Sequence, residues 1–152
     1  MANDPNASII RRFVDELWNR RNLEVADEIF ADNCVTHQLQ SGSPPTSAPR
    51  DPETIKQHVR EWLQAFPDLT FGVEQMVVAE DRVASHITMQ GTHIGTWMGV
   101  APTGRRISIQ MMTIHRIEAG KIVEDWVLVD SLGLFQQLGL VAEREKLFAQ
   151  AR

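Results

Sequence analysis

The spacing of the apolar residues changes once along the chain, just before Leu69, and this change limits the folds open to it. Up to Phe66 the apolar residues recur every three to four positions, which is the period of an amphipathic helix. From Leu69 onward they recur at every second position, which is the period of a β-strand. Helices that precede the strands, instead of alternating with them, predict an α+β fold.

Three helices are predicted in the first part of the chain. Two of them open with an Asp-Pro pair, in which the aspartate caps the helix and the proline occupies its first turn. The third helix ends at Pro67, because proline cannot continue it. The helices are expected to begin at Asp4, at about Leu23 and at Asp51.

The segment between the second and third helices has no clear periodicity. Residues 34–37 are interpreted as a short extended piece. Residues 38–50, QLQSGSPPTSAPR, contain three prolines, three serines and a glycine, and they predict a loop. Loops of this length in a compact domain are often lids or disordered segments, so a lid over a pocket is one interpretation.

Four strands with short connections are predicted after the helices. Short turns join antiparallel neighbours, so we expect a twisted antiparallel sheet that curls over the helices and encloses a cone-shaped cavity. Residues 1–152 are expected to form a single α+β barrel domain, with residues 141–152 as a loosely packed tail. The strands are predicted at residues 69–79, 82–93, 106–117 and 121–129.

Composition narrows the classes of function. Hydrophobic residues make up 43% of the 152 residues and charged residues 23%, which is typical of a globular protein. The net charge of −5 argues against nucleic acid or an anionic membrane as the main partner. A single cysteine, Cys34, excludes an internal disulfide and is expected to be a small buried residue. No signal peptide or membrane-spanning run is predicted, so the expected location is cytoplasmic.

Asp130 is the first candidate for catalysis. Strict alternation over residues 122–130 places it at the end of a strand, on the same face as Trp126 and Leu128 and opposite to Asp125. If that face lines a cavity, desolvation would raise the basicity of the Asp130 carboxylate, as a general base needs. The alternative is that Asp130 caps a short helix that starts just after it. Position alone leaves both interpretations open.

Several further side chains are candidates for a pocket. On the second predicted strand, His86 and Thr88 belong to an entirely polar face, which is either a solvated outer face or a pocket wall. On the third strand, Met111 and His115 share a face, and His115 is either a pocket acid or a structural histidine. His37 lies next to the long loop, where a lid could meet a pocket.

Other classes of chemistry have little support in the sequence. The five histidines show no compact ligand spacing such as HxH or HExxH, so no metal site is predicted, although histidines from different strands could still converge. The motifs GxSxG, GxGxxG and the P-loop are absent, which leaves acyl-serine, dinucleotide and phosphate-loop chemistry unsupported.

With the strands placed, the chain resembles the SnoaL-like polyketide cyclase (ester cyclase) family over nearly its whole length. That family belongs to the nuclear transport factor 2-like superfamily, which also holds ketosteroid isomerase and limonene epoxide hydrolase. The last two matching blocks are fairly specific to the family, and the first is general to the superfamily. The blocks are RRFVDELWNRRNLEVADEIFADNCVTH, GTHIGTWMGVAPTGRRI and HRIEAGKIVEDWVLVDSLGLFQQLGL.

The resemblance implies a cone-shaped α+β barrel, a homodimer or higher homo-oligomer, no cofactor and a hydrophobic small-molecule substrate. It implies that Asp130 removes a proton from an activated carbon of an aromatic polyketide ester, with His115 as helper, and that the enolate closes a ring by aldol addition. The substrate-binding residues expected from position and resemblance are His37, His86, Thr88, Trp126, Leu128, Met111 and Trp18.

The chain departs from the family pattern at two positions. Relatives often carry histidine at the position of Asp125 and arginine at that of His86; on the face assignment above, Asp125 points away from the pocket.

Two alternatives to a cyclase are kept, namely a non-catalytic binding module and a hydrolase or hydroxylation-associated relative. A dimer is expected because the open face of the sheet needs cover, with Val123, Val127 and Val129 as the contact.

Overall fold

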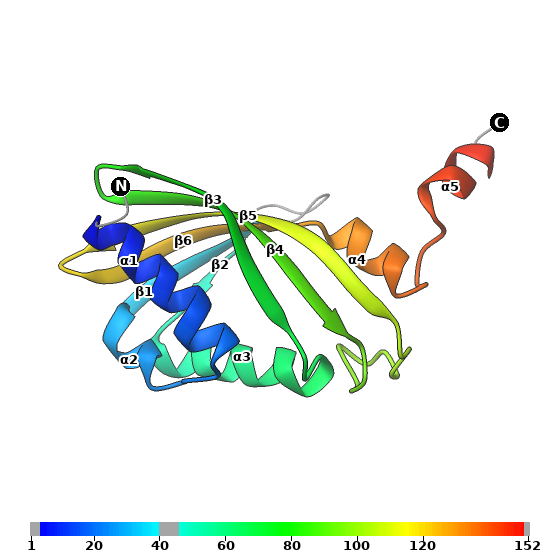
Figure 1. The fold of residues 1–152 in the computed structure, drawn as a ribbon, viewed down its shortest axis with the longest axis horizontal. Coiled ribbons are helices and arrows are strands. Elements are labelled where there is room, and N and C mark those ends of the chain that lie inside the picture. Colours follow the sequence, from blue (N-terminus) through cyan, green and yellow to red (C-terminus); the bar gives the residue numbers. More distant parts are fainter. Residues whose placement is uncertain (1–3, 40–45, 151–152) are drawn as a thin grey trace.

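In the computed structural model, which describes residues 4–39 and 46–150, a curved sheet lies against helices from the first half of the chain (Figure 1). The expected α+β class is therefore confirmed. The helical elements are α1 (Pro5–Arg12), η1 (Phe13–Asn19), α2 (Val25–Ile29), α3 (Pro52–Ala65), α4 (Ser131–Gln137) and α5 (Arg144–Gln150). The strands are β1 (Phe30–Leu39), β2 (Thr46–Pro49), β3 (Thr70–Ala79), β4 (Arg82–Thr92), β5 (Arg106–Glu118) and β6 (Lys121–Val129).

The six strands form one mixed sheet in the order β2-β1-β6-β5-β4-β3. The antiparallel hairpins β3–β4 and β5–β6 agree with the predicted strands to within about two residues. The pairing of β1 with β6 is parallel, so the sheet is not antiparallel throughout as expected from the short turns. Short turns report only on strands that follow one another, and β1 is separated from β6 by most of the chain.

Two strands were not recognised in the sequence. The extended piece predicted at residues 34–37 is the centre of the ten-residue β1, and β2 occupies part of the predicted loop 38–50. Val35 pairs with Pro49 and His37 with Ser47 across this hairpin. The remaining loop residues, 40–45, lie outside the described residues, and the lid interpretation stays a prediction.

The predicted aspartate caps are confirmed at both helix starts. The Asp4 carboxylate accepts hydrogen bonds from the backbone N–H groups of Asn6 and Ala7, at 2.9 and 3.1 Å. Asp51 accepts one from the N–H of Thr54 at 2.7 Å. The first helix then widens into the π-helix η1, where the N–H groups bond five residues back instead of four.

The two faces of the sheet differ in burial. On β4 and β5 every second residue is buried on the face turned toward the helices, as the two-residue period predicts. α1 contacts β3 and β4, η1 contacts β3, and α3 contacts β1. Large apolar side chains lie exposed on the opposite, outer face, among them Val77, Met112, Ile114 and Leu128.

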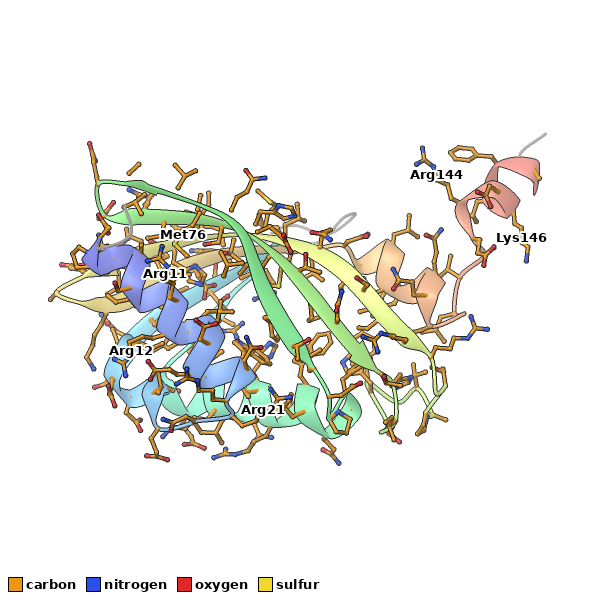
Figure 2. The ribbon with its side chains drawn as sticks, in the orientation of Figure 1. Arg11, Arg12, Arg21, Met76, Arg144 and Lys146 are labelled. Atoms are coloured by element: carbon orange, nitrogen blue, oxygen red, sulfur yellow. The ribbon has the colours of Figure 1, made fainter. Side chains whose placement is uncertain are left out.

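α5 lies away from the rest of the molecule, as Figure 2 shows with the labelled side chains of Arg144 and Lys146. The Arg144 guanidinium stands 5.8 Å from the centre of the Phe148 ring, which is 62% exposed. This element falls within the tail predicted to pack loosely. No helix among the described residues is long and apolar enough to cross a membrane; the cytoplasmic location stays a prediction.

Candidate active site

A cavity of about 100 Å³ lies between the inner face of the sheet and the helices. η1 contributes Phe13, Val14 and Trp18, since its wider turns bring the side chains of residues five apart to the same side. Most of the remaining lining is apolar, which lowers the local dielectric constant and strengthens electrostatic effects inside. The other large apolar walls are Ile55, Trp62, Phe71, Ile87, Met89 and Met111.

A β-bulge in β6 decides which of its residues face this cavity. Ile117 of β5 pairs with Ile122, but the next residue, Arg116, pairs with Glu124, so Val123 is an extra residue in β6. The bulge shifts the alternation by one, and both Ile122 and Asp125 are buried on the inner face. The alternation from Glu124 to Asp130 grouped these residues correctly, but the wrong face of the strand was expected to line the cavity.

The cavity is lined by Asp125, Val127 and Val129, not by the face of Trp126 and Leu128. The family departure at Asp125, expected to lie away from the pocket, falls inside it. The expected role of Val127 and Val129 in an outer contact is also wrong, because their side chains line the cavity.

Asp125 is 4% exposed and is held by a buried hydrogen-bond network. The hydroxyl of Thr36 on β1 donates a short hydrogen bond to its carboxylate. That hydroxyl in turn accepts from Gln38 Nε2 at 2.9 Å and, at a longer 3.4 Å, from Arg50 Nη2. The parallel pairing of Thr36 with Asp125 brings these groups together. Of the described residues that line the cavity, Asp125 alone carries a carboxyl group.

His115 stands directly across from Asp125 on β5 and is 1% exposed. Burial lowers the pKa of His115, with Arg50 adding to the effect, although the nearby Asp125 raises it. The ring is therefore neutral near pH 7. Its Nδ1 atom is buried and has no hydrogen-bond partner among the described residues, and the edge of Phe13 lies against the ring at 5.4 Å between centroids.

His58 on α3 also lines the cavity, although the helical pattern indicated only a boundary position. Burial lowers its pKa to about 4, with a further contribution from the charge of Arg50. The ring lies 6.0 Å from Trp18 and 6.4 Å from Trp62, in edge-on contacts.

Cys34, predicted to be a buried thiol, is 1% exposed, and burial raises its pKa to about 12.

The structure brings three of the nine predicted site residues to the cavity, namely His115, Met111 and Trp18. Asp130 lies outside it and is exposed. Its carboxylate accepts a hydrogen bond from the N–H of Gly133 at 2.9 Å and caps α4. A Cβ atom at Gly133 would overlap this carboxylate, so the glycine leaves room for the cap. The capping interpretation is confirmed.

His37 and Trp126 form a stacked pair on the outer face, with ring centroids 5.0 Å apart. His37 Nε2 lies 2.8 Å from a carboxylate oxygen of Glu124, and Nδ1 lies 2.8 Å from the hydroxyl of Ser47. Both residues had been expected in the pocket. The bulge turns Trp126 outward, and its parallel partner His37 follows to the same face.

His86 and Thr88 are also outside the cavity, so the solvated-face interpretation of their strand is the right one. His86 Nε2 lies 2.5 Å from Gln110 Oε1, and the Thr88 hydroxyl donates to Glu74 at 2.7 Å. Cross-strand polar pairs of this kind are typical of the exposed face of an antiparallel sheet.

A second, more open depression of about 390 Å³ collects four of the predicted site residues on the outer side of the sheet. They are Asp130, His86, Leu128 and Met111, and Met111 lines both hollows. Among the residues the structure describes, no group of three or more His, Cys, Asp or Glu side chains is placed to hold a metal ion.

Sequence reasoning missed Asp125, Arg50 and His58 as cavity residues. For Asp125 a signal was present, since it shares its side of the strand with Val127 and Val129, an apolar set typical of a buried face. Arg50 gave none, because it falls at the end of a proline-rich segment that predicts an exposed loop.

The cone-shaped sheet, the cavity and the placement of β6 fit the resemblance noted in the sequence. A family model for the SnoaL-like polyketide cyclases matches residues 8–138. The chain belongs to this family. SnoaL-like relatives cover most of the chain, and the similarity includes both the helical and the sheet parts.

Three SnoaL-like relatives illustrate the similarity. Aklanonic acid methyl ester cyclase DauD of Streptomyces sp. strain C5 is 29% identical, over 89% of this chain and 82% of its own length. The structure of IdmH from Streptomyces antibioticus, suggested to be a polyketide cyclase, superimposes with a TM-score of 0.74 at 33% identity, covering 88% of this chain and 98% of IdmH. AclR from Streptomyces galilaeus, suggested to be a hydroxylase, gives a TM-score of 0.78 at 30% identity, covering 96% and 89%.

Proposed function

We propose that this protein closes a ring in an aromatic polyketide β-keto ester by an intramolecular aldol addition, with Asp125 as the general base. The observation that carries the proposal is the buried Asp125 carboxyl group opposite His115 in a largely apolar cavity. The substrate class follows the relatives, since DauD is an aklanonic acid methyl ester cyclase.

The proposed reaction is balanced by two proton transfers. Asp125 takes a proton from the carbon between two carbonyl groups, and the C–H electron pair passes into the enolate. The enolate carbon then attacks a ketone carbon of the same molecule, and the new alkoxide takes the proton back from the protonated Asp125, which returns to a carboxylate. Because a carbon between two carbonyls is already acidic, a carboxylate in a dry site suffices, and no step calls for a metal or redox cofactor.

His115 is the group we assign to the attacked ketone. A neutral imidazole with a buried, unpartnered Nδ1 can donate a hydrogen bond to the ketone oxygen in the tautomer that carries hydrogen on Nδ1. That bond strengthens as charge develops on the oxygen, which is how a preorganised donor lowers a barrier. Met111 and Trp18 supply apolar walls for the aromatic rings of the substrate.

The test compares wild type with Asp125→Asn and Asp130→Asn on aklanonic acid methyl ester and simpler aromatic β-keto esters, followed by mass spectrometry. Wild type and Asp130→Asn are expected to give a product of unchanged mass, and Asp125→Asn to give none while remaining folded. Loss of turnover in Asp130→Asn alone, with its fold intact, would return the base role to Asp130 and move the site to the outer depression.

The same experiment separates the alternative functions. Hydrolysis would add the mass of one water to the substrate. Hydroxylation, the activity suggested for AclR, would add one oxygen atom and depend on a reductant or oxidant. Tight binding with no product from any variant would favour a binding module that holds an apolar small molecule.

A homodimer through the outer face of the sheet is part of the proposal. This face exposes 60% of Val77, 53% of Met112, 42% of Ile114 and 48% of Leu128. Met112, Ile114 and Leu128 lie on the neighbouring strands β5 and β6, and Val77 on β3 is joined to Ile114 through Ala84 of β4, which pairs with both. A second copy of the chain is the occupant we assign to this face, since one face of such a sheet is otherwise left uncovered.

A further inference from the structure

Arg50 is a buried cation in the wall of the cavity, 8% exposed, and the proposed reaction has not yet used it. It stands between β2 and the Asp51 cap of α3, and its backbone N–H donates to the carbonyl of Cys34 at 2.7 Å. The β1–β2 hairpin and the start of α3 therefore fix its position from both sides.

The guanidinium of Arg50 is under-satisfied. Its one hydrogen bond to a described side chain is the 3.4 Å contact from Nη2 to Thr36. The Nε atom is buried and finds no partner among the residues described. A buried polar group without a partner costs free energy, and a charged one costs more, so native proteins rarely keep one unless a ligand or an ordered water completes it.

The charged and titratable groups around Arg50 come from four elements, namely Asp125 on β6, His115 on β5, His58 on α3 and the Cys34 thiol on β1. Burial lowers the pKa of Arg50, and Asp125 is the main group that raises it. No carboxylate oxygen of the described residues lies within 4 Å of the guanidinium, because the Thr36 hydroxyl stands between Arg50 and Asp125. A guanidinium keeps its charge in proteins, so Arg50 is a cation whose Nε–H is free to bind a ligand oxygen.

Two other residues that line the cavity also carry a buried atom without a hydrogen-bond partner among the described residues. These atoms are Thr113 Oγ1 and His115 Nδ1. Three residues that line one mostly apolar cavity thus each carry a buried hydrogen-bonding atom without a described partner. This combination suits a ligand that is aromatic or aliphatic over most of its surface and carries several oxygen atoms.

We propose that Arg50 is the anion-binding residue of the cavity, and that its Nε–H binds the oxygen on which the enolate charge develops. This inference rests on the proposed function and adds the substrate chemistry that the site selects. The ligand is a 1,3-dicarbonyl or related compound whose acidic enol oxygen, once ionised, meets the Arg50 cation. Neutral aromatic compounds of the same size bind less tightly.

Conservation of charge supports this assignment. Proton transfer turns the Asp125 carboxylate into a neutral acid and turns the substrate into an enolate, so one negative charge moves from protein to ligand. Arg50 serves as counter-charge before and after the transfer, and the cavity keeps the same net charge throughout. When the new C–C bond forms, the charge passes to the ketone oxygen and is removed by the returning proton. A fixed cation in a dry site needs no reorganisation during these steps.

Binding of two matched probes tests the inference without any turnover. The probes are 4-hydroxycoumarin, a stable cyclic β-dicarbonyl that is ionised at neutral pH, and coumarin, which lacks the acidic enol. Quenching of tryptophan fluorescence reports binding, because Trp18 and Trp62 line the cavity. Wild type is expected to bind 4-hydroxycoumarin at least about tenfold more tightly than coumarin, the effect of one charge-assisted hydrogen bond.

The variants are Arg50→Gln and, as a matched control, Arg116→Gln, which removes an arginine that pairs with Glu124 on the outer face. Arg50→Gln should abolish the preference for the anionic probe and leave coumarin binding unchanged, whereas Arg116→Gln should keep it. If Arg50→Gln does not fold, Arg50→Lys, which retains the charge but lacks the Nε–H, should lose part of the preference.

Three results overturn the inference: equal binding of the two probes by wild type, no binding of 4-hydroxycoumarin, or a preference that survives in both Arg50 variants. None of these depends on Asp125. Failure of the proposed reaction appears instead as unchanged turnover in Asp125→Asn, so the two proposals fail separately.

Discussion

His115 and Asp125 face each other across the β5–β6 pair, and both are almost completely buried in the wall of one cavity. Residues that sit opposite in an antiparallel pair have Cβ atoms about 5 Å apart, so the two side chains work within reach of one small substrate. The arrangement places a carboxyl group beside an imidazole that burial keeps neutral.

If His115 and Asp125 act on the same transition state, the decreases in turnover caused by removing each group should not be additive in free energy. Asp125→Asn and His115→Gln are each expected to lower turnover of the β-keto ester by about 100-fold or more, the usual effect of losing a general acid or base. The double variant should be at most about tenfold slower than the worse single one. Steady-state rates on folded protein provide the measurement, and a double loss equal to the product of the single losses would contradict joint action.

Asp130 is expected to matter for stability. Asp130→Ala removes the carboxylate that accepts from the Gly133 N–H, and should lower the free energy of unfolding by about 1 kcal/mol. Asp130→Asn keeps a capping oxygen and should stay within about 0.5 kcal/mol of wild type. Urea unfolding of both variants measures the difference. Equal effects of the alanine and asparagine variants would mean that the cap contributes little.

Acid should destabilise the protein through His58. Its pKa is about 4 in the folded protein against an ordinary value of 6.5, so between these pH values the unfolded chain binds a proton that the folded one does not. The contribution of His58 to the free energy of unfolding is therefore fully present above pH 6.5 and decreases as the pH drops toward 4. The difference between the two pKa values corresponds to a loss of about 3 kcal/mol. His58→Gln should reduce the fall in the free energy of unfolding between pH 7 and pH 4, as measured by urea unfolding at each pH. An unchanged fall in this variant would show that His58 is not its cause.

Gly95 should tolerate no side chain. Its N–H donates to the carbonyl of Ala65 at 3.0 Å, and an added Cβ would overlap the Gln64 carbonyl oxygen and lie 2.9 Å from its carbon. Gly95→Ala is therefore expected to cost about 2 kcal/mol or more, because backbone, not a flexible side chain, blocks the space. Gly72→Ala is the control, since the nearest atom there is 3.6 Å away. Thermal unfolding compares the two, and equal midpoints would contradict the prediction.

The proposed dimer predicts that a charge on the outer face will separate the copies. Met112 and Leu128 are cross-strand partners and both exposed, so Met112→Glu would bury a carboxylate in the interface. Light scattering should give a dimer for wild type and a monomer for this variant, with circular dichroism unchanged. A wild-type monomer at all concentrations would remove the dimer from the proposal.

The fold class and most elements were predictable from the sequence because their signals are local. Aspartate caps, a proline that ends a helix and a two-residue period with tight turns all depend on neighbouring residues. β1 and β2 were missed because their pairing is not local; β1 joins β6 from the other end of the chain, and the segment around β2 has the composition of a loop.

The site was predicted less well than the fold, mainly because the wrong face of β6 was expected to line the cavity. The cavity positions of His115 and Met111 were predicted correctly because β5 alternates regularly on either side of them. Trp18 was also predicted correctly, because the π-helix around it differs from an α-helix only in its wider turns. On β6 the face with Trp126 and Leu128 was expected in the pocket because it leads to Asp130, whereas the cavity is lined by the face that Asp125 shares with the valines. The bulge at Val123 sets which of these faces meets the inner side of β5, and the bulge itself gives no periodic signal.

The same bulge has a consequence for how such enzymes change over time. Which face of β6 meets the cavity follows from its register with β5, and that register includes the extra residue Val123 between Ile122 and Glu124. A lineage that gained or lost one residue at Val123 would exchange the whole chemical lining of one strand in one step, while every codon for the lining residues stayed the same. Alignments of relatives that differ in length here would then match residues that face opposite sides of the sheet.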